Sequence, residues 1–229
     1  MYTENTRGCK PPNPASATVE QINEYTRMVI KGLIVCILPA CPRCDLESPR
    51  FKRHDVRRRN FHVVVEQIVH VVTGLLIRWK CPACGRTFTQ YPDFALPCKR
   101  YTLPTIMDLC SKYTEDEAAT YRKVVRSAQP GYRDTETQLE HSTVHRWLTC
   151  LSRLKTTLAR AADLILQAAP CSSACRDAAG LSVPSAKHRS DARKSLLERC
   201  RRLFFFEAEY RATFGLSIFP ELATACLHG

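Results

Sequence analysis

The sequence predicts an α+β fold in which a small antiparallel β domain, organised by four cysteines, precedes a helical bundle. Three observations support this prediction. Two Cys-x-x-Cys pairs begin at Cys41 and Cys81. The 36 residues between Cys44 and Cys81 contain several β-branched and apolar runs. After Tyr101, apolar residues recur at helical spacing. We therefore expect a β domain over residues 19–100 and a helical domain over residues 101–169.

The two cysteine pairs predict a single structural Zn²⁺ site. Each pair places two thiols at i and i+3 across a tight turn, and structural Zn²⁺ prefers four such ligands with no open position. Each pair has Pro after its first Cys, and Gly85 suits a turn that needs positive φ. The predicted ligands are Cys41, Cys44, Cys81 and Cys84. Because such pairs are usually about 15 to 20 residues apart, the longer separation predicts a zinc ribbon with a long hairpin or an insertion.

The composition indicates a basic globular protein. The 229 residues include 34 Lys plus Arg against 22 Asp plus Glu, which gives a net charge of +12. Such an excess favours a polyanionic partner, most simply double-stranded DNA, with an acidic membrane surface as the competitor. The 13 cysteines are not accompanied by a secretory signal pattern, so we expect a reduced, cytoplasmic protein. Neither 28–40 nor 61–77 is expected to span a membrane, because polar or charged residues interrupt both; both are expected to be strands.

The expected elements of the β domain follow in chain order. Residues 1–18 are polar and without periodicity, so we expect a flexible N-terminus. Val19–Met28 predicts a short helix that Lys31-Gly32 ends, and Leu33–Leu38 is β-prone and expected beside the first cysteine pair. Further strands are expected, with the strongest break at Thr73-Gly74. Their ranges are 61–65, 68–72, 75–80 and the closing strand 86–89.

Basic residues concentrate between the cysteine pairs. From Cys41 to Tyr101 there are 12 Lys or Arg against 5 Asp or Glu. This asymmetry predicts a face that contacts phosphates; the alternative is that the arginine run 57–59 is a solvated turn. The predicted DNA-contacting residues of this face are Lys52, Arg53, Arg57, Arg58 and Arg59.

The helical domain is expected to contain three helices. Pro104–Tyr113 begins with Pro, and Thr114 with Glu117 resembles a capping box for a helix through Arg126 that buries Ala118, Tyr121 and Val125. Ser142 is expected to cap a long third helix that continues to Gln167. A basic last helix is typical of a helix-turn-helix, whose recognition helix enters the major groove. Its predicted DNA-contacting residues are Thr143, His145 and Arg146, and a plain bundle helix is the alternative.

Residues 170–229 are expected to form a linker followed by a basic and apolar helical segment. Lys187–Arg202 predicts a basic helix, and the apolar stretch 203–219 is expected to pack on the main body or on a partner. A homodimer is therefore among the expected assemblies. Cys171 and Cys175 would bind a metal only with two further ligands from elsewhere.

Several motifs together resemble a known family. They are Cys41-x-x-Cys44, the basic segment 54–59, Arg78-Trp-Lys-Cys81-Pro-x-Cys84-Gly-Arg-Thr-Phe-Thr89, and Ser142-Thr-Val-His-Arg-Trp147. Over residues 35–165 the chain is similar to the N-terminal zinc-ribbon and helix-turn-helix region of bacterial insertion-sequence transposases and to related stand-alone proteins. This resemblance implies DNA binding, with zinc held by the four cysteines. Only about 60 residues follow Pro170, which leaves too little chain for the RNase H-type catalytic domain of such transposases, so we expect no enzymatic activity.

The leading hypothesis is thus a zinc-dependent, transposase-like DNA-binding protein that is associated with the nucleoid. The alternative is a zinc-stabilised module that binds a protein or RNA. A thiol oxidoreductase is the least favoured alternative, because neither cysteine pair begins a helix in a βαβ unit.

Overall fold

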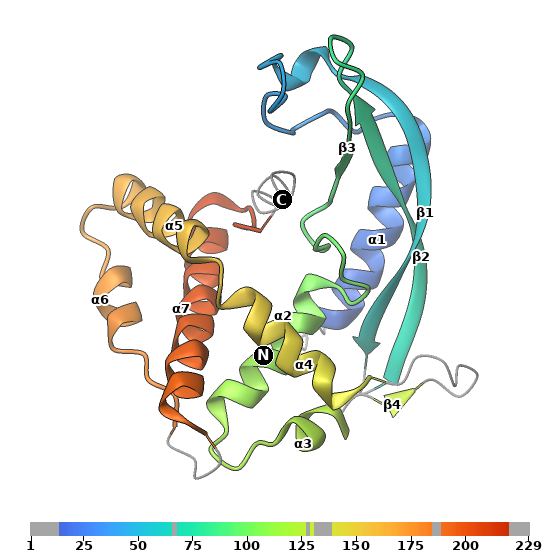
Figure 1. Cartoon of the computed structure of the whole chain (residues 1–229). Helices are drawn as coiled ribbons and strands as arrows, with labels where there is room; N and C mark the ends of the chain where they lie inside the picture. The colour runs from blue at the N-terminus through green and yellow to red at the C-terminus, as the bar shows by residue number, and fades with distance from the viewer. Residues whose placement is uncertain (1–13, 66–67, 127–128, 131–138, 185–188, 220–229) are drawn as a thin grey trace, which may run out of the picture.

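The computed structural model of the chain describes residues 14–65, 68–126, 129–130, 139–184 and 189–219. These described residues form an α+β fold, as predicted. A curved antiparallel sheet with one helix along it adjoins a group of helices from the second half of the chain (Figure 1). No described helix is long and apolar enough to cross a membrane.

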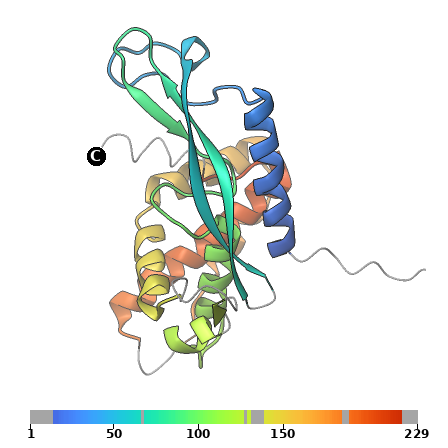
Figure 2. The ribbon, with the colours of Figure 1, turned by 90° about the vertical axis from the view of Figure 1, so that its right-hand side faces the viewer.

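Helix α1 (Pro14–Lys31) packs along the sheet (Figure 2). It is longer than the predicted Val19–Met28, so the expectation of flexibility is wrong for residues 14–18; residues 1–13 lie outside the described residues. Gly32, with φ of 72°, ends the helix. The guanidinium of Arg53 donates to the carbonyl oxygen of Val29 at 3.0 Å. Arg53 is therefore a second donor to this carbonyl of the last helical turn, which also accepts from the N–H of Gly32 at 3.2 Å.

The sheet is built from β1 (Lys52–Val65), β2 (Ile68–Lys80) and β3 (Thr87–Gln90), which pair in the order β1-β2-β3. A 3-10 turn (Ser48–Arg50) precedes β1, and the short β4 (Gln129–Pro130) pairs in parallel with the start of β2. The long β1–β2 hairpin accounts for the unusual separation of the cysteine pairs. The arginine run 57–59 lies within β1 rather than in a turn.

The predicted break at Thr73-Gly74 is wrong, because β2 runs through both residues. Gly74 lies opposite Arg59 in the ladder. A Cβ atom at Gly74 would lie 2.9 Å from a ring carbon of Phe61 and 3.0 Å from a methyl carbon of Ile22. Glycine is needed here because α1 and the Phe61 ring approach the strand closely, and not because the chain turns.

The β structure predicted for Leu33–Leu38 is also wrong, because this segment forms no strand. Its residues still alternate, because Ile34, Cys36 and Leu38 pack towards the core while Leu33, Val35 and Ile37 are exposed. The side chain of Gln90 holds it, accepting from the N–H of Ile37 at 3.2 Å and donating to the Val35 carbonyl at 3.1 Å. A side chain thus replaces the backbone ladder that the β propensity predicted.

Helices α2 (Leu103–Glu115), α3 (Tyr121–Arg126) and α4 (His141–Leu151) occupy the region of the three predicted helices. The predicted capping box at Thr114 is wrong, because Thr114 lies inside α2. The hydroxyl of Thr120 instead accepts from the N–H of Lys123 at 3.1 Å at the start of α3. Of the residues predicted to be buried, Ala118 is exposed, whereas Tyr121 and Val125 are partly buried against the core. Ala119 and Val124 are the fully buried residues of this region.

The predicted long helix from Ser142 to Gln167 is two helices. Glu140 occupies the N-cap position of α4, so Ser142 is already within the helix. The chain leaves helical geometry at Leu154, whose ψ is 49°, and α5 (Lys155–Ala168) begins after it. The buried face of α4 is the predicted one, with Val144, Trp147, Leu148 and Leu151 in the core.

The last part of the chain contains α6 (Ala174–Ala179) and α7 (Asp191–Phe214). The hydroxyl of Ser190 caps α7, and Gly215 ends it in the left-handed conformation. Leu197, Leu203 and Phe204 of α7 join the same core as α2, α4 and α5. The apolar C-terminal stretch therefore packs on the main body, which was one of the two expected outcomes.

Candidate functional site

The four predicted cysteine ligands come together at one end of the sheet. Cys41 and Cys44 lie in a turn before β1, and Cys81 and Cys84 lie in the turn between β2 and β3. Their Sγ atoms all lie within 4.8 Å of one another. The Cys41–Cys84 and Cys44–Cys81 sulfur pairs are 3.5 Å apart. Sulfurs in a tetrahedral site with Zn–S bonds of about 2.3 Å are about 3.8 Å apart, so the cluster has the size of a metal site.

The two turns have matching backbone geometry. In each turn the first Cys donates its N–H to the residue five positions later, at 2.8 Å for both Cys41 to Leu46 and Cys81 to Arg86. The residue after the second Cys has positive φ, which is 54° at Asp45 and 73° at Gly85. Gly85 was recognised in the sequence, but Asp45 was missed. Its position equivalent to Gly85 was the available signal, because Asp tolerates this conformation better than most residues.

The thiols of this cluster affect one another's ionisation in opposite directions, favouring the thiolate of Cys41 and disfavouring that of Cys44. Burial raises the pKa of Cys41, but hydrogen bonds from the backbone of Arg43 and from the Cys84 thiol lower it to about 7 on balance. The backbone of Leu46 lowers the pKa of Cys44, but burial and the neighbouring thiols raise it to about 12. A bound divalent cation would favour the thiolate form of all four cysteines, because the thiolate is the form that binds metals.

The surroundings of the cluster favour a structural site. Cys41 and Cys81 are fully buried in a small core with Trp79, and the rings of Phe51 and Phe88 stack with centroids 5.5 Å apart. All four donors are thiols, so a tetrahedral metal would have no position left for a substrate or a reactive water. Both pairs lie in turns and neither begins a helix, which differs from the usual placement of redox-active cysteine pairs.

Two of the five basic residues predicted for the β domain have internal partners. Arg53 binds the end of α1, as described above. The guanidinium of Arg59 donates to the carbonyls of Leu96 and Lys99 and lies 5.3 Å from the ring centroid of Tyr91. Arg59 therefore anchors the segment that follows β3. If either side chain turned towards a ligand, these carbonyl oxygens would lose a hydrogen-bond donor.

The other three predicted residues of β1 project from the protein. Lys52 and Arg58 are exposed and form no ion pair with any described residue. Arg57 pairs with Asp55 at 3.2 Å, and both side chains remain largely exposed. Exposed pairs of this kind contribute little, so Arg57 is still available to a stronger anionic partner. The bulge between Arg53 and Asp55 adds twist to this basic strand.

The three predicted residues of α4 have different environments. Arg146 is exposed, and its guanidinium donates to the hydroxyl of Thr143 at 3.3 Å. His145 packs edge-on against the ring of Tyr121 in α3, with centroids 5.6 Å apart. Burial and then the positive charge of Arg193 lower its pKa. The lowered pKa favours the neutral form of His145, and Arg146 is the basic residue of the three that stays charged at every working pH.

Comparisons with known proteins add one finding. Residues 41–147 are similar to a family described as a domain of unknown function (DUF6431). The match begins at the first cysteine of the cluster and ends at Trp147 in α4, so it spans the metal-site cysteines, the basic strand and most of α4. Searches of curated proteins and of solved structures found no match.

Proposed function

We propose that the chain is a DNA-binding protein in which Cys41, Cys44, Cys81 and Cys84 hold one structural Zn²⁺. The observation that carries the proposal is the combination of the four-thiol cluster with three exposed basic side chains, Lys52, Arg57 and Arg58, on the hairpin that the cluster closes. Bound zinc would hold the start of β1 and the end of β2 together at the open end of this hairpin. Lys52, Arg57 and Arg58 would contact phosphates, and α4 would be the recognition helix of a helix-turn-helix-like unit.

The mutual packing of α2, α3 and α4 supports the helix-turn-helix part of the proposal. The connection from Arg126 to His141 is longer than the three or four residues of the usual turn. The unit is therefore proposed as helix-turn-helix-like, with α4 presenting Arg146. A relation to transposases is proposed only for this DNA-binding role, without catalysis by the chain itself.

Metal content and salt-dependent DNA binding test the proposal together. Protein purified without added metal is expected to contain one Zn²⁺ per chain, and a strong chelator is expected to unfold the hairpin, since structural zinc contributes on the order of 10 kcal/mol to folding. Binding to a DNA duplex should weaken linearly with the logarithm of salt concentration. A protein that is fully folded with no bound metal, or binding that does not respond to salt, would contradict the proposal.

One observation favours the second candidate, a zinc-stabilised protein-interaction module. Leu33, Val35 and Ile37 are 61%, 72% and 64% exposed along the extended segment beside β3. They border a cavity of about 780 Å³ that also contacts α1, α2 and the end of α7. Because the proposed DNA contacts lie on β1 and α4, substituting these three residues by Ser should leave DNA binding unchanged. The same substitutions should weaken the binding of a protein partner if the second candidate holds.

A further inference from the structure

Two sets of basic residues in the helical part differ in their partners. Arg189 and Arg193 are held by internal acceptors: Arg189 donates to the carbonyl of Tyr113, and Arg193 donates to Tyr121 and Thr149. By contrast, Arg100, Arg153 and Lys155 are exposed and form no ion pair with any described residue. Only the second group is free to meet an external anion without losing an internal bond.

The exposed basic residues without partners among the described residues extend the exposed face of α4. Arg146, Cys150 and Arg153 are spaced i, i+4 and i+7, which places them on one face of a helix. The turn after α4 preserves this alignment, because the N–H of Arg153 bonds to the carbonyl of Cys150 at 3.2 Å. On the neighbouring side of α4, Thr149 accepts from Arg193 in α7. The exposed stripe of α4 is therefore Arg146, Cys150 and Arg153, and His145 lies outside it.

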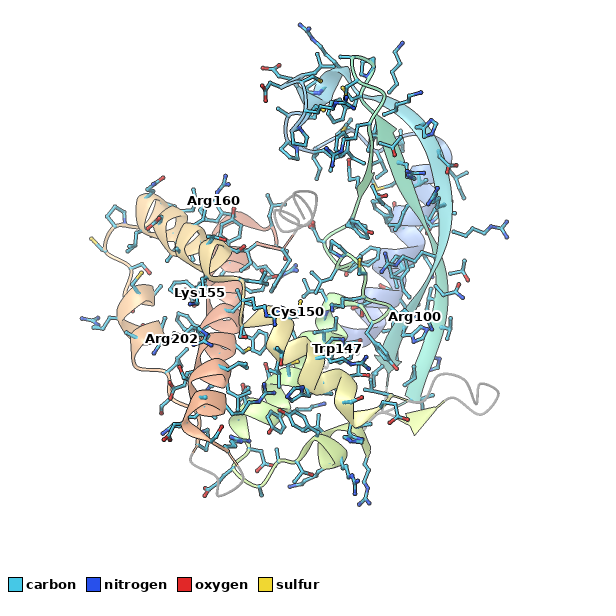
Figure 3. All side chains as sticks on the ribbon, viewed as in Figure 1. Arg100, Trp147, Cys150, Lys155, Arg160 and Arg202 are labelled. Atoms are coloured by element: carbon cyan, nitrogen blue, oxygen red, sulfur yellow. The ribbon has the colours of Figure 1, made fainter. Side chains whose placement is uncertain are left out.

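Arg100 extends this stripe towards the sheet. Its carbonyl accepts from the N–H of His62 in β1 at 2.9 Å, which fixes its backbone to the strand. The next residue, Tyr101, packs edge-on against Trp147 of α4, with centroids 5.2 Å apart. Arg100 is thus held where the sheet meets α4. In the view of Figure 3, Cys150 on α4 lies between Lys155 on one side and Arg100, towards the sheet, on the other.

The chain segment under this stripe lacks opposing charge. Residues 141–162, which span α4 and the first half of α5, contain four Lys or Arg and no Asp or Glu. Within this segment Arg146, Arg153 and Lys155 therefore contribute a local excess of positive charge. The stripe is also separate in the fold from the basic residues of β1, which lie on the hairpin that the cysteine cluster closes.

We propose that Arg146, Cys150 and Arg153, with Lys155 and Arg100, form a second phosphate-contacting surface, the α4 band, which binds the DNA backbone. This proposal rests on the proposed DNA-binding function. It shifts the contact face of α4 away from Thr143 and His145 and towards the turn before α5. The duplex would then lie along α4 with cationic contacts at both ends, from Arg100 beside the sheet and from Lys155 at the start of α5.

Charge neutralisation tests the α4 band in the full-length, zinc-loaded protein. The variant Arg100→Gln/Arg153→Gln/Lys155→Gln is compared with a control that removes three exposed charges elsewhere, Arg27→Gln/Lys31→Gln/Arg176→Gln. Affinity for a mixed-sequence DNA duplex is measured by fluorescence anisotropy over a salt series. If each residue contacts one phosphate, the band variant should lose about 2.7 from the slope of log K against log salt, at about 0.9 per contact. The control should keep the wild-type slope.

A charge introduced at the centre of the band provides a second test. Cys150 and Cys171 are both exposed. Cys150→Glu should weaken DNA binding by roughly ten-fold or more, because a carboxylate facing phosphates is repelled. Cys171→Glu, in the turn between α5 and α6, should leave binding unchanged, and Cys150→Ser should bind like the wild type. Equal effects of the two Glu substitutions would overturn the proposal.

The outcomes separate the two proposals. Wild-type DNA binding with an unchanged slope in the band variant would refute the α4 band and leave the DNA-binding function standing. If the wild type binds no DNA, the proposed function fails, and the salt concentration that elutes each variant from immobilised heparin decides whether the band binds polyanions at all. Earlier elution of the band variant than of its control would support an anion-binding surface. Identical elution would refute it.

Discussion

Gly74→Ala is a sharp test of the packing between α1 and the hairpin. Gly74 lies in the middle of β2, and the Cβ of alanine would lie 2.9 Å from Phe61 and 3.0 Å from Ile22. Ordinary contacts of this kind are 3.4–4 Å, so the shortfall at Phe61 is at least 3.4 − 2.9 = 0.5 Å. Phe61 is 1% exposed and Ile22 is 0% exposed, so neither side chain can move away into solvent.

The expected loss follows from two opposing terms. Forcing an extra carbon into a packed core costs about 1–3 kcal/mol, whereas replacing Gly restricts the unfolded chain and recovers about 0.4–1 kcal/mol. The net loss of unfolding free energy should be about 1–2 kcal/mol. For a protein of this size the melting temperature should fall by about 2–8 °C.

Thermal and urea unfolding measure this effect, and Gly180→Ala is the matched control. Gly180 has a φ of −75° and its Cβ would meet no atom closer than 3.5 Å, so this substitution should be neutral or slightly stabilising. Phe61→Leu removes the ring carbon nearest to Gly74, so a double-mutant cycle should show a coupling of about 0.5–3 kcal/mol. A stable Gly74→Ala variant, or an additive cycle, would refute the packing argument.

Two further predictions concern buried or partly buried charges in the helical part. Glu207 is buried and accepts from Arg211 and from the N–H of Ile218, so Glu207→Gln should lower the free energy of unfolding by about 1–3 kcal/mol; a loss below about 0.5 kcal/mol in urea unfolding would exclude this role. Burial and the charge of Arg193 should hold the pKa of His145 below its ordinary value of 6.5, as an NMR titration can measure. Because the folded pKa is lowered, this site should contribute stability that is lost as the pH falls from about 6.5 through the folded pKa. An unshifted titration would contradict the influence of the Tyr121 contact and of the Arg193 charge on His145.

Local patterns in the sequence were sufficient for much of the fold. Two Cys-x-x-Cys pairs predicted the cysteine cluster, because the i, i+3 spacing alone brings two thiols to one side of a turn. Pro104 marked the start of α2, and the apolar spacing around Trp147 identified the buried face of α4. The predictions at Thr73-Gly74 and at Thr114 failed because they rested on the local preference of each residue, whereas packing decided its role.

The sequence by itself determined which residues are basic and on which elements most of them lie. Only the tertiary structure decided which of them are free. Arg53 and Arg59 belong to the same strand as Arg58, yet each satisfies a carbonyl oxygen of a segment distant in sequence, and Arg58 satisfies none. Backbone carbonyls that lack partners at helix ends and in connectors attract guanidinium groups. Because the fold brings those carbonyls to particular side chains, the charges left for a partner cannot be read from composition or spacing.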